Sequence, residues 1–160
     1  MKKTAKIGLL AVLMVFALAA YAAAGEINIK DIKTPVPEEG IKIIPPDSSI
    51  PSDIANYSGV WEGTYDNGRD VTLIIEKIEL PPGKVLAIYS WGNLGRSFGN
   101  YYKVEGAVEK DSIVFERNID KITITISPGK TKDTANLDWE RYDAMRGRRT
   151  VYTTLKKKGQ

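Results

Sequence analysis

Residues 59–80 read GVWEGTYDNGRDVTLIIEKIEL, and this stretch decides the expected fold. It contains two runs of the β-branched and aromatic residues that strands favour, separated by Asp66-Asn67-Gly68. An Asn-Gly pair suits a tight turn because that turn needs positive φ. The stretch therefore predicts two antiparallel strands, at 59–65 and 71–80, joined as a hairpin.

The same pattern continues to the end of the chain. Further strands are predicted at 85–91, 101–109, 112–117, 121–127, 136–142 and 150–156. Short strands repeated at intervals of about 8 to 12 residues are typical of a β-sandwich or a β-barrel. The chain beyond Tyr57 is therefore expected to be an all-β domain, 57–158, with eight strands.

Alternation within the strands predicts which faces are buried. Ile122, Ile124 and Ile126 alternate with threonines, so one face of that strand is expected to be apolar and the other solvated. Both faces of 85–91 are apolar, which indicates a covered strand in the middle of the sheet.

One strand contains an interruption of this alternation. Between Ile75 and Ile78 the two-residue period slips by one position. This slip predicts a β-bulge near Glu76 and Lys77.

The first twenty-four residues have the three-part pattern of a secretory signal peptide. Three lysines precede an uncharged apolar run, 7–21, which is followed by Ala22, Ala23 and Ala24. We expect cleavage after Ala24, a periplasmic or secreted protein, and no stable membrane anchor after cleavage. The alternative is an uncleaved anchor helix, which the alanine-rich end and the polar sequence that follows disfavour.

Residues 25–56 are predicted to form a flexible, Pro-rich linker. Five prolines lie in this segment, and each fixes φ and removes a backbone donor. One short apolar run, Ile41 to Ile44, could add itself to the domain as an edge strand.

Composition excludes several classes of function. Without residues 1–24, which contain three lysines and no acid, the chain has 20 basic and 20 acidic residues. Only Lys156, Lys157 and Lys158 form a basic run, so the sequence does not indicate the concentrated basic surface that nucleic acid binding needs, and no nucleic acid partner is expected. Because the sequence contains no Cys and no His, it lacks thiol nucleophiles, Ser-His dyads and most ligands for zinc or copper. We expect no cofactor, no metal and no catalytic residues.

The first strand resembles the start of lipocalin-like proteins. Gly59-Val60-Trp61 matches the Gly-x-Trp pattern of the calycin group of barrels. The resemblance implies a calycin-like, antiparallel up-and-down eight-stranded β-barrel. It also implies that Trp61 packs across one end of the barrel beneath a cation near the last strand, for which Arg148 or Arg149 is the expected match.

A second likeness concerns exported proteins. Tyr89-Ser90-Trp91-Gly92, taken together with Tyr57 to Trp61, resembles small exported bacterial barrel domains. An eight-stranded barrel has an interior just sufficient for its own side chains or for one small ligand. The sequence leaves two alternatives, a core filled by side chains and a cavity that can hold a ligand.

Two groups of residues are candidates for ligand binding. The first surrounds a Gly-rich loop, which could form the mouth of a barrel. It comprises Tyr89, Trp91, Asn93, Arg96 and Tyr101, and Phe98 and Tyr102 lie in the same cluster. The alternative is that Tyr89 and Trp91 are core residues, since every barrel needs core aromatics.

The second group is Trp139 and Arg141 together with Tyr142, and an outward-facing Trp139 could stack on a sugar or a partner protein. The alternation of inward and outward residues along a strand favours inward packing of Trp139 instead.

These observations favour a non-enzymatic binding protein that holds a small apolar or amphipathic ligand at the open end of its barrel. The alternative is a module with a filled core whose exposed aromatic surface contacts a protein or a glycan of the cell envelope. An enzyme is a third hypothesis, because Asp, Glu, Lys and Tyr can act as acids and bases.

Overall fold

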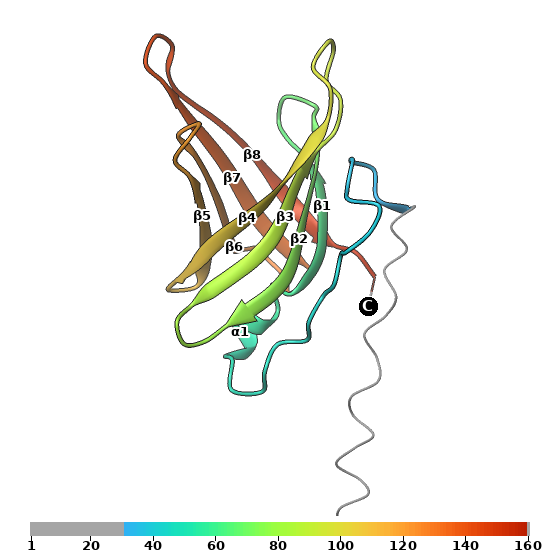
Figure 1. Ribbon diagram of the computed structural model, residues 1–160, viewed down its shortest axis with the longest axis vertical. Coiled ribbons are helices and arrows are strands. Elements are labelled where there is room, and N and C mark those ends of the chain that lie inside the picture. Colours follow the sequence, from blue (N-terminus) through green and yellow to red (C-terminus); the bar gives the residue numbers. More distant parts are fainter. Residues whose placement is uncertain (1–30, 160) are drawn as a thin grey trace, which may run out of the picture.

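A computed structural model describes residues 31–159, which form a closed barrel of eight antiparallel strands (Figure 1). Each strand pairs with the next along the chain, and the last pairs with the first. This confirms the predicted all-β, up-and-down, eight-stranded barrel. The strands are β1 (Gly59–Thr64), β2 (Asp70–Glu79), β3 (Lys84–Trp91), β4 (Asn100–Glu109), β5 (Ser112–Arg117), β6 (Ile122–Pro128), β7 (Thr134–Asp143) and β8 (Gly147–Lys157). The predicted signal peptide and its cleavage site lie outside the described residues.

The β1–β2 hairpin forms where its turn residues predict it. Gly68 has φ +84°, which suits glycine because it has no Cβ, and its N–H donates to the carbonyl of Tyr65 at 2.8 Å. In β2 the register against β3 shifts between Ile75 and Lys77, which confirms the predicted bulge.

The barrel closes where β1 meets β8. Trp61 pairs with Lys157 and Glu62 with Lys156, and the N–H of Lys158 donates to the carbonyl of Val60 at 2.9 Å. Gly63 permits this close approach, because a Cβ there would lie 2.9 Å from the Leu155 side chain.

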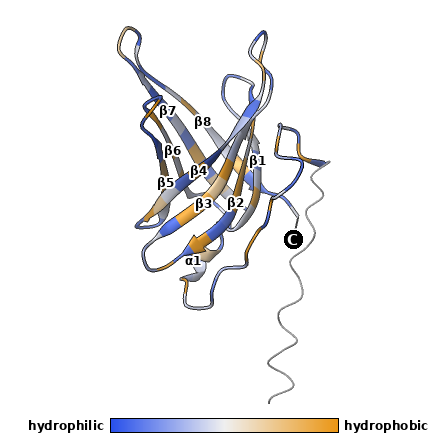
Figure 2. Cartoon of the chain, viewed as in Figure 1, coloured by the Kyte–Doolittle hydropathy of each residue, from blue (hydrophilic) through white to orange (hydrophobic). Residues whose placement is uncertain are grey.

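The interior of the barrel is filled with apolar side chains. Ile122, Ile124 and Ile126 point into this core with at most 8% of their surface exposed, as their alternation predicts. Figure 2 shows hydrophobic residues along strands such as β2 and β3, and both faces of these two strands are largely buried.

One end of the barrel is closed by the chain that leads into β1. The short helix α1 (Ser52–Ala55) lies across this end (Figure 1), and Ile50 and Ile54 join the core. Trp61 is fully buried here and its Nε1 donates to the carbonyl of Tyr57 at 2.7 Å. We call this the closed end.

The cation beside Trp61 is a lysine, which corrects the sequence-based expectation. The Nζ of Lys157 lies 5.4 Å from the Trp61 ring, and burial lowers the pKa of this lysine. Arg148 and Arg149 lie at the start of β8, opposite Tyr142 and Arg141. Because β8 runs the full height of the barrel, its first residues and Trp61 lie at opposite ends.

Residues 31–44 lie against the outside of the barrel, and we call them the strap. Val60, Ile74 and Ile88 form an outward-facing apolar patch on β1, β2 and β3. The strap covers this patch with four partly buried aliphatic side chains, which are Ile32, Val36, Ile41 and Ile43. The sequence analysis did not predict these contacts, although they explain why both faces of β3 are apolar.

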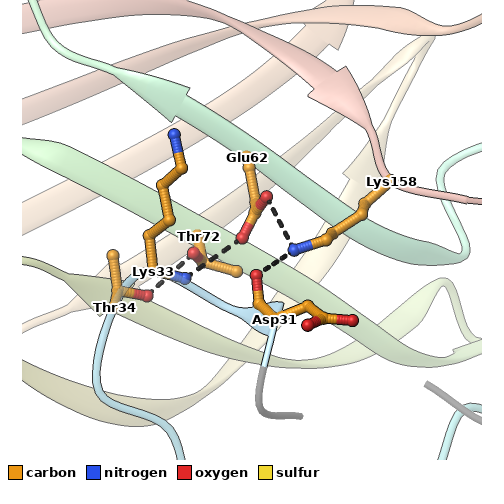
Figure 3. A network of polar contacts seen from close by, with 6 residues as sticks. All are labelled: Asp31, Lys33, Thr34, Glu62, Thr72 and Lys158. Atoms are coloured by element: carbon orange, nitrogen blue, oxygen red, sulfur yellow. Dashed lines mark hydrogen bonds and ion pairs between the residues drawn. The ribbon is translucent and has the colours of Figure 1, made fainter. Parts of the chain in front are cut away.

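Polar contacts fix the strap to the sheet (Figure 3). The hydroxyl of Thr34 donates to that of Thr72 at 2.7 Å in a buried contact. Lys158, which pairs with Glu62 at 3.2 Å, also donates to the carbonyl of Asp31. The N–H of Ile44 donates to the carbonyl of Glu76, but residues 41–44 do not form the edge strand considered from sequence.

Within the described residues no helix has the length and apolar character needed to cross a membrane.

Candidate ligand site at the open end of the barrel

The end opposite α1 is formed by four loops, and we call it the open end (Figure 1). They connect β1 to β2, β3 to β4, β5 to β6 and β7 to β8. In an up-and-down barrel alternate connections must lie at the same end. Both groups of ligand-binding residues predicted from the sequence belong to this end or to the strands just beneath it.

A layer of aromatic side chains lies beneath the open end. The hydroxyls of Tyr65 and Tyr89 are 3.0 Å apart in a buried hydrogen bond. The ring of Trp91 lies 5.6 Å from that of Tyr89 and 4.9 Å from that of Tyr102. The guanidinium of Arg117 covers the Tyr102 ring, with Cζ 3.5 Å from the ring centroid. These contacts separate the apolar core from the loops.

Burial changes the acidity of this layer. It raises the pKa of Tyr89 to about 12, and it also raises the pKa of Tyr65 well above its ordinary value. Both hydroxyls are therefore neutral at physiological pH. As neutral groups they can donate and accept hydrogen bonds, but here they bond to each other.

The space inside this layer is small. A cavity of about 10 Å³ lies between Tyr89, Tyr102, Phe115 and Arg117. A cavity of that size holds about one water molecule. The layer therefore acts as packing, and Tyr89, which is 4% exposed, is part of the core.

The structure separates the other predicted residues of the first group. Asn93 is exposed in the β3–β4 loop, where its Oδ1 accepts a hydrogen bond from the N–H of Gly99 at 2.6 Å. Arg96 is exposed in the same loop. Tyr101 lies on β4 and is 36% exposed. Asn93 therefore shapes the loop, whereas Arg96 faces solvent at the open end.

Trp139 and Arg141 lie on β7 and differ in environment. Trp139 is partly buried and packs against the core, as its alternation with Leu137 indicates. Arg141 is exposed and contributes to a pocket at the rim of the open end.

This rim pocket has a volume of about 370 Å³ and is open to solvent. It lies between the β5–β6 turn and the β7–β8 hairpin. Its lining residues are Glu116, Arg117, Asn118, Lys121, Ile122, Thr123, Glu140, Arg141, Tyr142 and Arg148. The volume is within the range of about 300 to 1,000 Å³ that is usual for small-molecule sites.

Cations outnumber anions in the rim pocket by four to two. Arg148 forms an ion pair with Glu140 at 3.4 Å, and Arg117 pairs with Asp120 at 2.7 Å. The Nζ of Lys121 lies 5.3 Å from the Tyr142 ring. The arrangement can bind an anionic group through its cations and stack a ring or an acyl chain against Tyr142.

Arg117 and Lys121 are cations of this pocket that the sequence analysis did not single out. They flank a turn with no motif of its own. The available signal was the topology, because the β5–β6 turn must lie at the same end as the β3–β4 and β7–β8 loops.

In the acidic turn between β1 and β2, the side chains of Asn67 and Asp70 accept hydrogen bonds from within the turn. Asp70 accepts a hydrogen bond from the Thr64 hydroxyl at 2.7 Å, and Asn67 accepts one from the N–H of Arg69 at 3.0 Å. Among the described residues there is no group of three or more acidic residues placed to hold a metal ion.

No protein-family model matches the chain, and no curated protein matches it.

Proposed function

We propose that this chain is an exported, non-enzymatic binding protein of lipocalin-like architecture. Its ligand would be a small amphipathic molecule with an anionic group, bound at the open end of the barrel. The observation that carries the proposal is the rim pocket, which combines four cations with the Tyr142 ring directly above a filled core. Export is supported by the signal-like pattern of residues 1–24.

The filled interior determines where such a ligand would lie. The cavity of about 10 Å³ is far below the volume of a lipid or a fatty acid, so the ligand would occupy the rim. Its anionic group would contact Lys121 and Arg141, and its apolar part would lie along Ile119 and Met145, which are both exposed nearby.

The first test uses dodecyl phosphate below its critical micelle concentration, followed by NMR chemical shifts. We expect shifts at Lys121, Arg141 and Tyr142, and an affinity at least tenfold lower for Arg141→Gln. Lys130→Gln is the matched control, because Lys130 is an exposed cation in the loop between β6 and β7 at the closed end. Binding of uncharged dodecyl maltoside with equal affinity, or an Arg141→Gln variant that binds normally, would contradict the proposal.

A second candidate function is an interaction module for a protein or a glycan of the cell envelope. The filled core and the exposed tyrosines support it, since Tyr142 is 54% and Tyr152 is 61% exposed. Native mass spectrometry of protein purified from the periplasm distinguishes the two candidates. A co-purifying small molecule favours the ligand-binding protein. A chain without a bound molecule that also fails to bind dodecyl phosphate favours the interaction module.

A further inference from the structure

Exposed hydrophobic side chains are concentrated at the open end. Among the described residues the three most exposed large ones are Met145 at 97%, Ile119 at 88% and Phe98 at 85%. They lie in the β7–β8, β5–β6 and β3–β4 loops. Three loops of one end thus present apolar side chains to solvent, and such a cluster marks an interaction surface more often than single scattered residues do.

Hydrogen bonds within each loop hold these side chains outward. In the β7–β8 hairpin, Asp143 accepts from the N–H groups of Met145 and Arg146 at 2.8 and 3.0 Å, and these bonds lower the pKa of its carboxyl. In the β5–β6 turn, Arg117 pairs with Asp120 on either side of Ile119.

The β3–β4 loop is fixed in the same way. Leu94 and Ser97 exchange two backbone hydrogen bonds at 2.9 and 3.0 Å, immediately before Phe98. The exposure of the three apolar side chains is therefore a consequence of ordered loops, which lowers the entropic cost of using them to bind.

The same end has a positive charge. Residues 65–69, 92–99, 117–121 and 140–149 include eight Lys or Arg and four Asp or Glu, a net charge of +4. Because the chain after residue 24 is formally neutral, the remainder has a net charge of −4. The apolar loops therefore lie in a part of the chain that carries a net positive charge.

We propose that the open end docks on the surface of an anionic lipid bilayer. Phe98, Ile119 and Met145 would enter the interface to a depth of about 5 to 10 Å, as apolar faces of peripheral proteins do. The surrounding arginines would contact the anionic headgroups. The inference deepens the proposed function, since docking would bring the rim pocket to the source of an amphipathic ligand.

The proposal is tested by co-sedimentation with lipid vesicles. The protein is purified from the periplasm after export, and all variants are prepared identically. Vesicles of phosphatidylcholine alone are compared with vesicles that contain about one third phosphatidylglycerol. We expect the protein to bind the anionic vesicles. The triple variant Phe98→Ser, Ile119→Ser and Met145→Ser should partition at least tenfold more weakly. Binding should be lost when the salt concentration is raised from ~0.1 M to ~0.5 M. Tyr152→Ser, an exposed aromatic on the wall of β8, is the matched control.

A second measurement locates the docking surface directly. The chain has no cysteine, so Met145→Cys and Lys130→Cys each give a single site for an environment-sensitive fluorophore. Anionic vesicles should shift the emission to shorter wavelength at position 145 and leave position 130, at the closed end, unchanged.

The outcomes separate this inference from the proposed function. Binding of anionic vesicles by a chain that does not bind dodecyl phosphate supports docking and contradicts the proposed function. Equal binding of neutral and anionic vesicles, or a triple variant that partitions normally, overturns the docking proposal. So does a concentration-dependent dimer that the triple variant abolishes in the absence of vesicle binding, because the loops would then contact a second copy of the chain.

Discussion

At the closed end of the barrel Trp61 has no exposed surface, whereas at the open end Met145 is 97% exposed. The closed end buries its aromatic ring beneath Lys157 and against Tyr57. The open end holds its apolar side chains in solvent with hydrogen-bonded loops. Large hydrophobic residues thus stabilise the fold at one end, and at the other they are available for contacts with another molecule.

The largest effect is expected at the closed end. Trp61→Ala removes a fully buried ring and its hydrogen bond to Tyr57, so the free energy of unfolding should fall by about 3 to 5 kcal/mol. Urea denaturation followed by circular dichroism measures the change. Tyr152→Ala serves as the exposed control, and a Trp61→Ala variant as stable as this control would show that the closed end is not sealed by Trp61.

An intermediate effect is expected from the aromatic layer between the two ends. The pKa of Tyr89 is raised by burial from 10.0 to about 12, so its neutral form is favoured in the folded state. Stability is then unaffected below about pH 10 and falls as the pH rises from there to about 12, by about 1 to 3 kcal/mol from this residue.

Tyr89→Phe removes the ionisable group and tests this pH dependence. Unfolding curves recorded at a series of pH values should show a smaller alkaline loss of stability for Tyr89→Phe than for the unmodified chain. Parallel losses in the two proteins would mean that Tyr89 does not mark the boundary of the buried region.

The smallest effect on stability is expected at the open end. The triple variant Phe98→Ser, Ile119→Ser and Met145→Ser replaces exposed side chains, so its free energy of unfolding should stay within about 0.5 kcal/mol of the unmodified chain. Thermal and urea denaturation measure this. A loss above about 1 kcal/mol would mean that the loops pack as part of the fold, and the contrast between the two ends would disappear.

The strap shows how a local pattern can leave a long-range contact undecided. The prolines of 25–56 correctly exclude long strands and helices from the part of this segment that the structure describes. They carry no information about where the segment lies. Its aliphatic residues cover Val60, Ile74 and Ile88, and this contact depends on the spatial order of three strands.

The candidate site was predictable only in part for the same reason. Arg141 was found from sequence because it lies near Trp139 on one strand. Arg117 and Lys121 were not, because they join the rim pocket only when β5 and β6 lie beside β7 in the closed sheet.

Local patterns of residues were sufficient to predict the strands, the hairpin turn, the bulge in β2 and the number of strands, because each depends on neighbours a few residues apart. Three features became visible only in the folded barrel: the cation that covers Trp61, the filled core, and the set of side chains at the open end. Those features depend on the register of β8 against β1 and on the direction of each loop, and both are set by closure of the whole sheet.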